Sequence, residues 1–192
     1  MGMETKQQHT QHVIRAVRAD EWEKVKELRL DALRDPVASL AFLETFEQAA
    51  AKPDEFWQDR AAGAAEGVHV AQIIAEAPDG QWNGSVSVFI EDAGTKDFLE
   101  QVVETDQAHV VGVFVRAEQR GSGLTDALFE AALEWVWARE EPVLERARLF
   151  VHESNERAAG FYRRFGFRAS GLVIPKPDDP TAREHEYVFA RP

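Results

Sequence analysis

The sequence has no cysteine among its 192 residues, which excludes disulfide frameworks, thiolate metal sites and cysteine nucleophiles. It also has no apolar run approaching the ~18 residues of a membrane span. Residues 1–12 are polar and lack the apolar region that a signal peptide needs. We therefore expect a cytoplasmic protein without a membrane segment, in which residues 1–12 form a short disordered tail.

Basic residues are scarce relative to acidic ones. Lys and Arg number 22 against 34 Asp and Glu, which gives a formal net charge of −12. This balance argues against binding to the phosphates of nucleic acids and to anionic membranes, and it suits a positively charged substrate. The length, with 44% hydrophobic and 29% charged residues, is typical of one globular domain, which we place at residues 13–192.

Several catalytic and nucleotide-binding motifs are missing as well. The sequence contains no G-x-x-x-x-G-K-[ST] loop, no complete G-x-G-x-x-G fingerprint and no G-x-S-x-G elbow. The six histidines show no spacing typical of metal ligands, so we expect no metal site. These absences leave other kinds of phosphate site open.

The hydrophobic periodicity predicts seven strands and four helices in one mixed α/β domain. The expected helices begin after an N-cap at Asp20, after Pro53, near Gly121 and at Asn155, and the first ends at Asp35–Pro36. The strands are expected at residues 13–18, 68–74, 82–90, 108–115 and 147–152, after Gly166, and at 186–190.

The stretch Val113–Thr125 runs from an apolar strand through a glycine-containing loop into a helix. Glycines there allow close backbone approach to a ligand, and the first N–H groups of the helix point outward. Together with Arg120, such a terminus favours a phosphate or pyrophosphate. A simple strand–helix turn is the alternative interpretation of this segment.

A second informative stretch is Asn155–Phe167, about 35 residues after Arg120. Asn155 and Tyr162 are seven residues apart, so they share one helix face and lie roughly 10 Å apart along its axis. The strand before it, Leu149–His152, is expected to place this helix beside the earlier one.

The two stretches together resemble the GCN5-related N-acetyltransferase (GNAT) family. The family motif Arg/Gln-x-x-Gly-x-Gly/Ala matches residues 120–125 except at Thr125, where glycine or alanine is usual. The later Asn…Ala…Tyr…Gly-Phe pattern matches Asn155, Ala158, Tyr162 and Gly166–Phe167. Ala117 stands where proline is common. The order of elements over residues 13 to 190 also fits, which implies a mixed, mostly antiparallel sheet with a splayed cofactor cleft.

The resemblance implies acetyl-CoA as the co-substrate, bound where the strands ending at Val115 and His152 diverge. Backbone groups of Val113, Phe114 and Val115 would face the pantetheine arm, and Asn155 would bond to it. The pyrophosphate would be held by Arg120, Gly121, Ser122, Gly123, Leu124 and Thr125.

Acetyl transfer to an amine needs a proton acceptor, because an alkyl amine is almost fully protonated at neutral pH. The family often carries a carboxylate on the central strand, and the matching position here is His109, which titrates in a suitable range. Glu104 and Glu91 are alternatives, and a structural role for His109 stays open. Tyr162 is expected to protonate the departing thiolate, with packing of the helix face as its alternative role.

The acceptor site is expected under the segment Leu40–Glu47, with Phe42 and Glu44 as candidate ligands of an amine. Trp135 and Trp137 are assigned to the core or to a homodimer surface. The favoured function is transfer of acetyl from acetyl-CoA to a primary amine of a small molecule or of a protein or peptide. The alternatives are an acetyl-CoA-binding sensor without catalysis, and a nucleotide-phosphate-binding protein of another fold.

Overall fold

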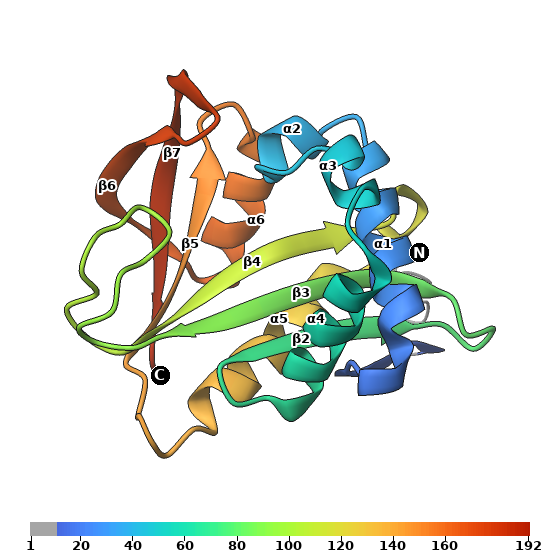
Figure 1. Ribbon diagram of the computed structural model, residues 1–192. Coiled ribbons are helices and arrows are strands. Elements are labelled where there is room, and N and C mark those ends of the chain that lie inside the picture. Colours follow the sequence, from blue (N-terminus) through green and yellow to red (C-terminus); the bar gives the residue numbers. More distant parts are fainter. Residues whose placement is uncertain (1–10) are drawn as a thin grey trace, which may run out of the picture.

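The protein is built on one seven-stranded sheet with the strand order β1-β2-β3-β4-β5-β7-β6 (Figure 1). The computed structural model describes residues 11–192, so most of the expected tail lies outside the described residues. All neighbouring strands pair antiparallel except β4 and β5, which confirms the predicted mixed sheet. The strands are β1 (Val13–Ala16), β2 (Val70–Glu76), β3 (Trp82–Glu91), β4 (Gln107–Val115), β5 (Arg146–His152), β6 (Arg168–Lys176) and β7 (Asp179–Ala190).

Helices cover both faces of the sheet. Two of them, α5 (Leu124–Trp137) and α6 (Glu156–Phe165), lie behind the sheet in Figure 1. The opposite face carries α1 (Trp22–Arg34), α2 (Ala38–Ala41), α3 (Phe46–Ala50) and α4 (Asp54–Glu66), and two 3₁₀ turns span Ala19–Glu21 and Ala117–Gln119. The four predicted helices are present, and α2 and α3 are additional short ones. The predicted N-cap is wrong, because Asp20 lies inside the first 3₁₀ turn and Glu21 precedes α1.

The apolar side chains form two cores, one on each side of the sheet. The core under α5 and α6 centres on Phe129, which is fully buried among the rings of Tyr162 and Phe167. The core under α1 and α4 is built around the buried Trp57 and Trp82. Trp135 and Trp137 are partly buried against the first core, in agreement with their expected packing role.

The parallel pair β4–β5 separates soon after it begins. Only Ala108–Ala147 and His109–Arg148 are paired, so the remainder of both strands diverges. On its other side β4 contains a bulge, because Val111 opposes Ser87 while Phe114 opposes Ser85. Gly112 takes a left-handed φ of 62° within this bulge. A bulge bends its strand, and this one lies where the two strands part.

Candidate active site

A cavity of about 590 Å³ lies in the region where β4 and β5 diverge. Its walls come from the end of β4, the loop before α5, the start of α6 and residues 35–42. Ten predicted site residues line it: Phe42, Val113, Phe114, Val115, Arg120, Gly121, Gly123, Thr125, Asn155 and Tyr162. Ser122, Leu124, Glu44 and His109 do not.

The loop before α5 presents backbone N–H groups to this cavity. Gly121 and Gly123 have φ angles of 79° and 89°, in the left-handed region that favours glycine, and Gly123 is the N-cap of α5. Within the described residues, the N–H groups of Gly123, Leu124 and Thr125 have no backbone acceptor. Leu124 does not line the cavity, because the whole residue is fully buried in the core. Such an array at a helix N-terminus is suited to a phosphate group.

Ser122 takes part in the turn itself rather than in the cavity wall. Its hydroxyl donates to the carbonyl of Gln119 at 2.6 Å, and its N–H is directed to the same carbonyl. The side chain therefore stabilises the loop shape on which the neighbouring glycines depend.

Arg120 is held by two partners at the mouth of the cavity. Its Nε donates to the Val115 carbonyl at 2.9 Å, and its guanidinium pairs with the Asp35 carboxylate at the end of α1. An anion bound by Arg120 would share the guanidinium with Asp35. A parallel contact, Arg116 to Asp31 at 2.8 Å, joins the same two segments one helical turn away.

Sequence reasoning missed several residues of the cavity wall. Arg157 and Arg164, on α6, add positive charge beside the glycine loop, and Asp35 and Val37 close the opposite side. Arg157 lies two residues after Asn155, so its position on the first turn of α6 was available from the sequence. The pairing of Asp35 with Arg120 could not be predicted from the sequence, because it depends on how the end of α1 is placed against the loop after β4.

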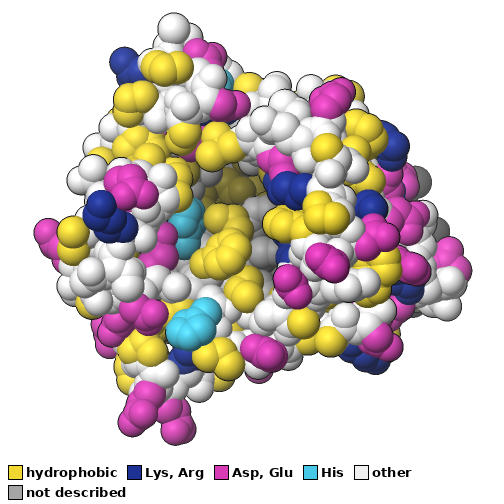
Figure 2. Space-filling view, in the orientation of Figure 1, with side chains coloured by type: hydrophobic (Ala, Val, Ile, Leu, Met, Phe, Trp, Pro, Cys, Tyr) yellow, Lys and Arg dark blue, Asp and Glu magenta, His cyan; other side chains and the backbone are white. Residues whose placement is uncertain are grey.

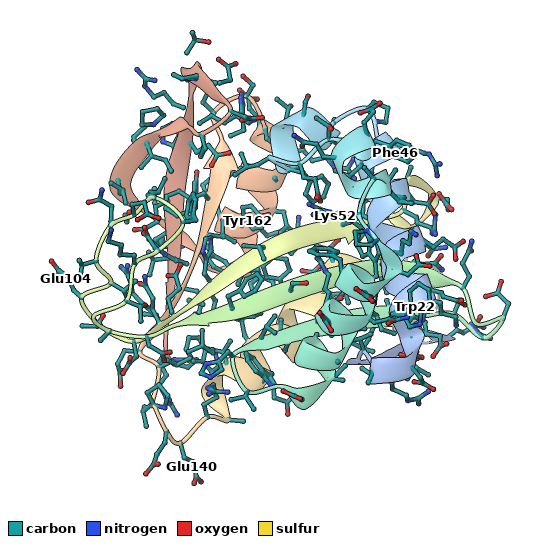
Figure 3. The ribbon with its side chains drawn as sticks, in the orientation of Figure 1. Trp22, Phe46, Lys52, Glu104, Glu140 and Tyr162 are labelled. Carbon is teal, nitrogen blue, oxygen red and sulfur yellow. The ribbon has the colours of Figure 1, made fainter. Side chains whose placement is uncertain are left out.

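Tyr162 projects from α6 into the gap between β4 and β5 (Figure 3). Its ring packs against Phe129, Phe167 and Tyr187. Burial raises the pKa of the phenol above its usual value of about 10. The hydroxyl is therefore fully protonated at neutral pH, and the raised pKa makes it a weaker acid than an exposed phenol.

Asn155 is the N-cap of α6 and lines the same cavity. Its Oδ1 accepts a hydrogen bond from the Ala158 N–H at 3.3 Å, which leaves the side-chain NH₂ as a donor. Its own N–H donates to the carbonyl of His152, the last residue of β5. Asn155 thus joins the end of β5 to the start of the helix that carries Tyr162.

His109 lies on β4 in a network of charged side chains. Its Nδ1 is 3.0 Å from Oε1 of Glu91, and its ring packs against Phe98 and Phe150, which also contact each other. Glu91 also accepts hydrogen bonds from Arg148, at 2.9 and 3.0 Å. An ionised Glu91 only accepts, so Nδ1 carries the proton and Nε2 of the neutral ring is left with a lone pair.

The two alternative proton acceptors are placed less favourably. Burial alone would raise the pKa of Glu91, but the hydrogen bond from His109 and the Arg148 guanidinium lower it to about 2. A carboxylate with that pKa is a weak base at neutral pH. Glu104 is exposed in the loop between β3 and β4, at the outer edge of the molecule and far from Tyr162 in Figure 3.

The two predicted acceptor ligands differ in their surroundings. Phe42 is buried at the cavity wall, with the Arg29 guanidinium carbon 4.5 Å from its ring centroid. The Glu44 carboxylate pairs with Arg29 at 3.0 Å and with Lys52. Glu44 therefore ties α1 to the α3 region, and its charge is already balanced by two cations.

The molecular surface is hollowed over the sheet, on the side that carries α1 to α4. Figure 2 shows hydrophobic side chains on the floor of this hollow, a histidine on one wall and basic side chains on the other. In residues 11–192 there is no cluster of three His, Asp or Glu side chains that could hold a metal ion. No helix among the described residues is long and apolar enough to cross a membrane.

The splayed parallel pair, the glycine loop and the tyrosine between the strands define an acetyltransferase-type architecture. The model of the acetyltransferase (GNAT) family matches residues 22–167, and the chain belongs to this family. This confirms the family and the fold that the two motifs predict.

Among sequence relatives, a Bacillus subtilis (strain 168) protein bears the name of a ribosomal protein bS18-alanine N-acetyltransferase. It is 33% identical over 67 residues, which cover 35% of this chain and 42% of that protein. The matched region therefore spans less than half the length of this relative.

Solved structures share the fold across nearly the whole chain. A GNAT acetyltransferase from Streptococcus pneumoniae has a TM-score of 0.71 at 14% identity, covering 94% of this chain and 99% of that one. Arabidopsis thaliana NAA60 in complex with acetyl-CoA has a TM-score of 0.67 at 17% identity, with the same coverage.

The residues of the cavity fit acetyl-CoA. Past His109, the edge of β4 that faces β5 has no strand partner, so its peptide groups are available to the amides of a pantetheine arm. The N–H groups at the start of α5, with Arg120 and Arg157 nearby, match a pyrophosphate in both charge and hydrogen bonding.

Proposed function

We propose that this protein transfers an acetyl group from acetyl-CoA to a primary amine of a small molecule or of a protein or peptide. One observation carries the proposal: the free N–H groups before α5, the unpaired edge of β4, Asn155 and Tyr162 meet in a single cavity. Bound acetyl-CoA supplies an activated acetyl thioester.

The cofactor-binding role belongs to the loop and strand residues. Gly121, Gly123 and Thr125 bind the pyrophosphate through their N–H groups, Ser122 fixes the turn, and Leu124 anchors the start of α5 in the core. Val113, Phe114 and Val115 offer peptide groups to the pantetheine arm, as does the side-chain NH₂ of Asn155. Arg120 contributes a charge that it shares with Asp35.

Two residues handle the protons of the reaction. Nε2 of His109 accepts a proton from the amine, and Glu91 holds the imidazole in the tautomer that leaves Nε2 free. The C–N bond forms as the C–S bond breaks, and the Tyr162 hydroxyl gives its proton to the leaving sulfur. Phe42 shapes the acceptor side of the cavity, whereas Glu44 stabilises the helices around it.

The family membership and the name of the Bacillus subtilis relative support an N-acetyltransferase. That name also supports a protein amino group as one acceptor class and the cytoplasm as the compartment.

The test combines calorimetry with a turnover assay. We expect acetyl-CoA to bind the purified protein, and we expect a panel of amines to release free CoA thiol. Binding without turnover on any amine or peptide would instead support an acetyl-CoA sensor. Equal affinity for ATP and acetyl-CoA, or no binding at millimolar concentration by the folded protein, would overturn the proposal.

A further inference from the structure

Glu184, on β7, is a buried carboxylate without a partner. Only 9% of the residue is exposed, and no described residue in 11–192 makes a hydrogen bond or ion pair with its side chain. Three other acids on this side of the sheet, Glu91, Asp97 and Glu186, all bind Arg148 at 2.8 to 3.2 Å. Its carboxylate oxygens are not among the fully buried side-chain atoms that lack a partner, so they keep contact with solvent and are open to a ligand.

Two histidines flank this carboxylate on the same face of the sheet. His152 stands directly opposite Glu184 in the β5–β7 register, and directly opposed side chains project to the same side. His152 accepts a hydrogen bond at Nδ1 from the Ser154 N–H at 3.0 Å, so the neutral ring carries its proton on Nε2. His109 lies on the same face, with its ring centroid 5.7 Å from that of Phe150, which is two residues before His152 on β5.

The remaining charged neighbours do not balance Glu184. Lys176 lies nearby, but its ammonium group pairs with Asp178, next to the hairpin that joins β6 to β7. Burial raises the pKa of Glu184 and Asp178 adds to the effect, while Lys176, His152 and His109 oppose it. With Lys176 and Asp178 cancelling each other, this cluster retains one uncompensated negative charge when Glu184 is ionised.

The position of Glu184 connects it to the candidate active site. His152, its cross-strand neighbour, ends β5 and accepts the N–H of Asn155, a residue of the cofactor cavity. His109, its other electrostatic neighbour, is the proton acceptor of the proposed reaction. The face that bears Glu184 is opposite to the one under α5 and α6, because Val151 and Tyr187 beside it point into that core.

We propose that Glu184 binds the ammonium group of the acceptor, beside His109 and His152, and so selects amines that arrive positively charged. This inference rests on the proposed function and narrows its acceptor to alkyl amines and peptide α-amino groups in their protonated form. The ammonium supplies the charge that the carboxylate lacks, on the face of the sheet that also bears His109.

The test compares the parent with Glu184→Gln on two classes of acceptor at pH 7. Butylamine and alanyl-alanine amide are largely protonated, whereas hydroxylamine and aniline are neutral. A charge-assisted hydrogen bond contributes about 1.5–3 kcal/mol, so we expect kcat/KM for the cations to fall about 10- to 100-fold, mainly through KM. The neutral acceptors should change less than about twofold by the same reasoning.

Glu104→Gln is the matched control, because it removes the same charge from an exposed position far from Tyr162. It should leave both acceptor classes unaffected. An equal loss on both classes by Glu184→Gln, or no loss on the cations, would overturn the inference while the parent's turnover keeps the proposed function intact.

Two further measurements show whether an effect of Glu184→Gln comes from loss of the ammonium site rather than from misfolding or from a lack of catalysis. Because the folded-state pKa of Glu184 is raised, its ionisation costs stability as the pH rises above about 4.5. Glu184→Gln should therefore melt at or above the parent's temperature at pH 7. Calorimetry of butylamine on the CoA-saturated parent should show binding that Glu184→Gln lacks. If the parent bound butylamine, Glu184→Gln did not, and no amine were acetylated, the ammonium site would be supported and the proposed enzymatic activity contradicted.

Discussion

At the scale of single residues, removal of the Tyr162 hydroxyl tests the proposed protonation of the leaving thiolate most directly. Tyr162→Phe keeps the ring contacts with Phe129 and Phe167 and removes only the proton donor. We expect kcat to fall about 10²- to 10⁴-fold, the range typical of a lost general acid, with acetyl-CoA affinity little changed.

Tyr187→Phe is the control for that substitution. Its hydroxyl accepts a hydrogen bond from Arg163 at 3.1 Å and is not part of the cavity wall, so activity should persist. Steady-state kinetics with a good amine, together with calorimetry, distinguishes the two variants. Full activity of Tyr162→Phe at neutral pH would mean that solvent protonates the thiolate.

His109 gives a prediction about proton transfer. If Nε2 accepts the amine proton, His109→Gln should lower kcat by about 10²-fold or more. His69→Gln, at a histidine whose side chain is 70% exposed, should leave kcat unchanged. A kcat of His109→Gln close to that of the parent would return His109 to a structural role.

At the scale of elements, the loop before α5 depends on backbone shape. Gly123 has a φ of 89°, and a residue with a β-carbon pays about 1–2 kcal/mol to remain left-handed. Gly123→Val should therefore raise the Kd for acetyl-CoA at least about tenfold. Ser122→Ala, which loses only a hydrogen bond within the turn, should change the Kd much less.

Calorimetry of acetyl-CoA with both variants tests this difference, with thermal melting to show that each is folded. Equal affinity of Gly123→Val and the parent would show that the N–H groups of this loop do not set cofactor affinity.

The elements themselves were predictable to different degrees. Strong local signals placed β3, β4 and α5 within a few residues, because their apolar patterns are long and end at glycine or polar turns. β7 was predicted only over residues 186–190 but begins at Asp179, since its first half is polar and pairs at the sheet edge with β6. The short helices α2 and α3 carry too few residues for a periodic signal.

In the candidate site, as in the fold, features that are local in sequence could be predicted and those that depend on distant segments could not. Its motif residues could be predicted because the glycine loop and the α6 face are each local in sequence. Glu184, Asp35 and Arg148 could not, because their roles arise from pairing between segments far apart in the chain. The partner of a charged side chain cannot be read from the sequence when it depends on strand register.

At the scale of the whole molecule, the proposed acceptor and cofactor sites lie in different parts of the fold. The candidate cofactor cavity is bounded by the end of β4, the start of α6 and residues 35–42, whereas Glu184 lies on β7, on the face of the sheet opposite α5 and α6. The diverging strands β4 and β5 connect the two sides, and Tyr162 stands between these strands. An acceptor and a CoA molecule can thus approach from different directions.

The net charge of −12 adds a long-range effect to this local one. An acidic protein raises the encounter rate of cations, and salt weakens that attraction because the Debye length shrinks from about 30 Å at 0.01 M to about 10 Å at 0.1 M. We expect kcat/KM for butylamine to fall over this range, while the value for neutral hydroxylamine stays flat. Glu184→Gln should lower kcat/KM for butylamine. Because it removes only one of 34 acidic side chains, it should leave the dependence of kcat/KM on salt concentration unchanged. If kcat/KM of the parent for butylamine did not change with salt concentration, the acidic composition would serve solubility only. Glu184 would then be the sole source of a preference for cationic acceptors.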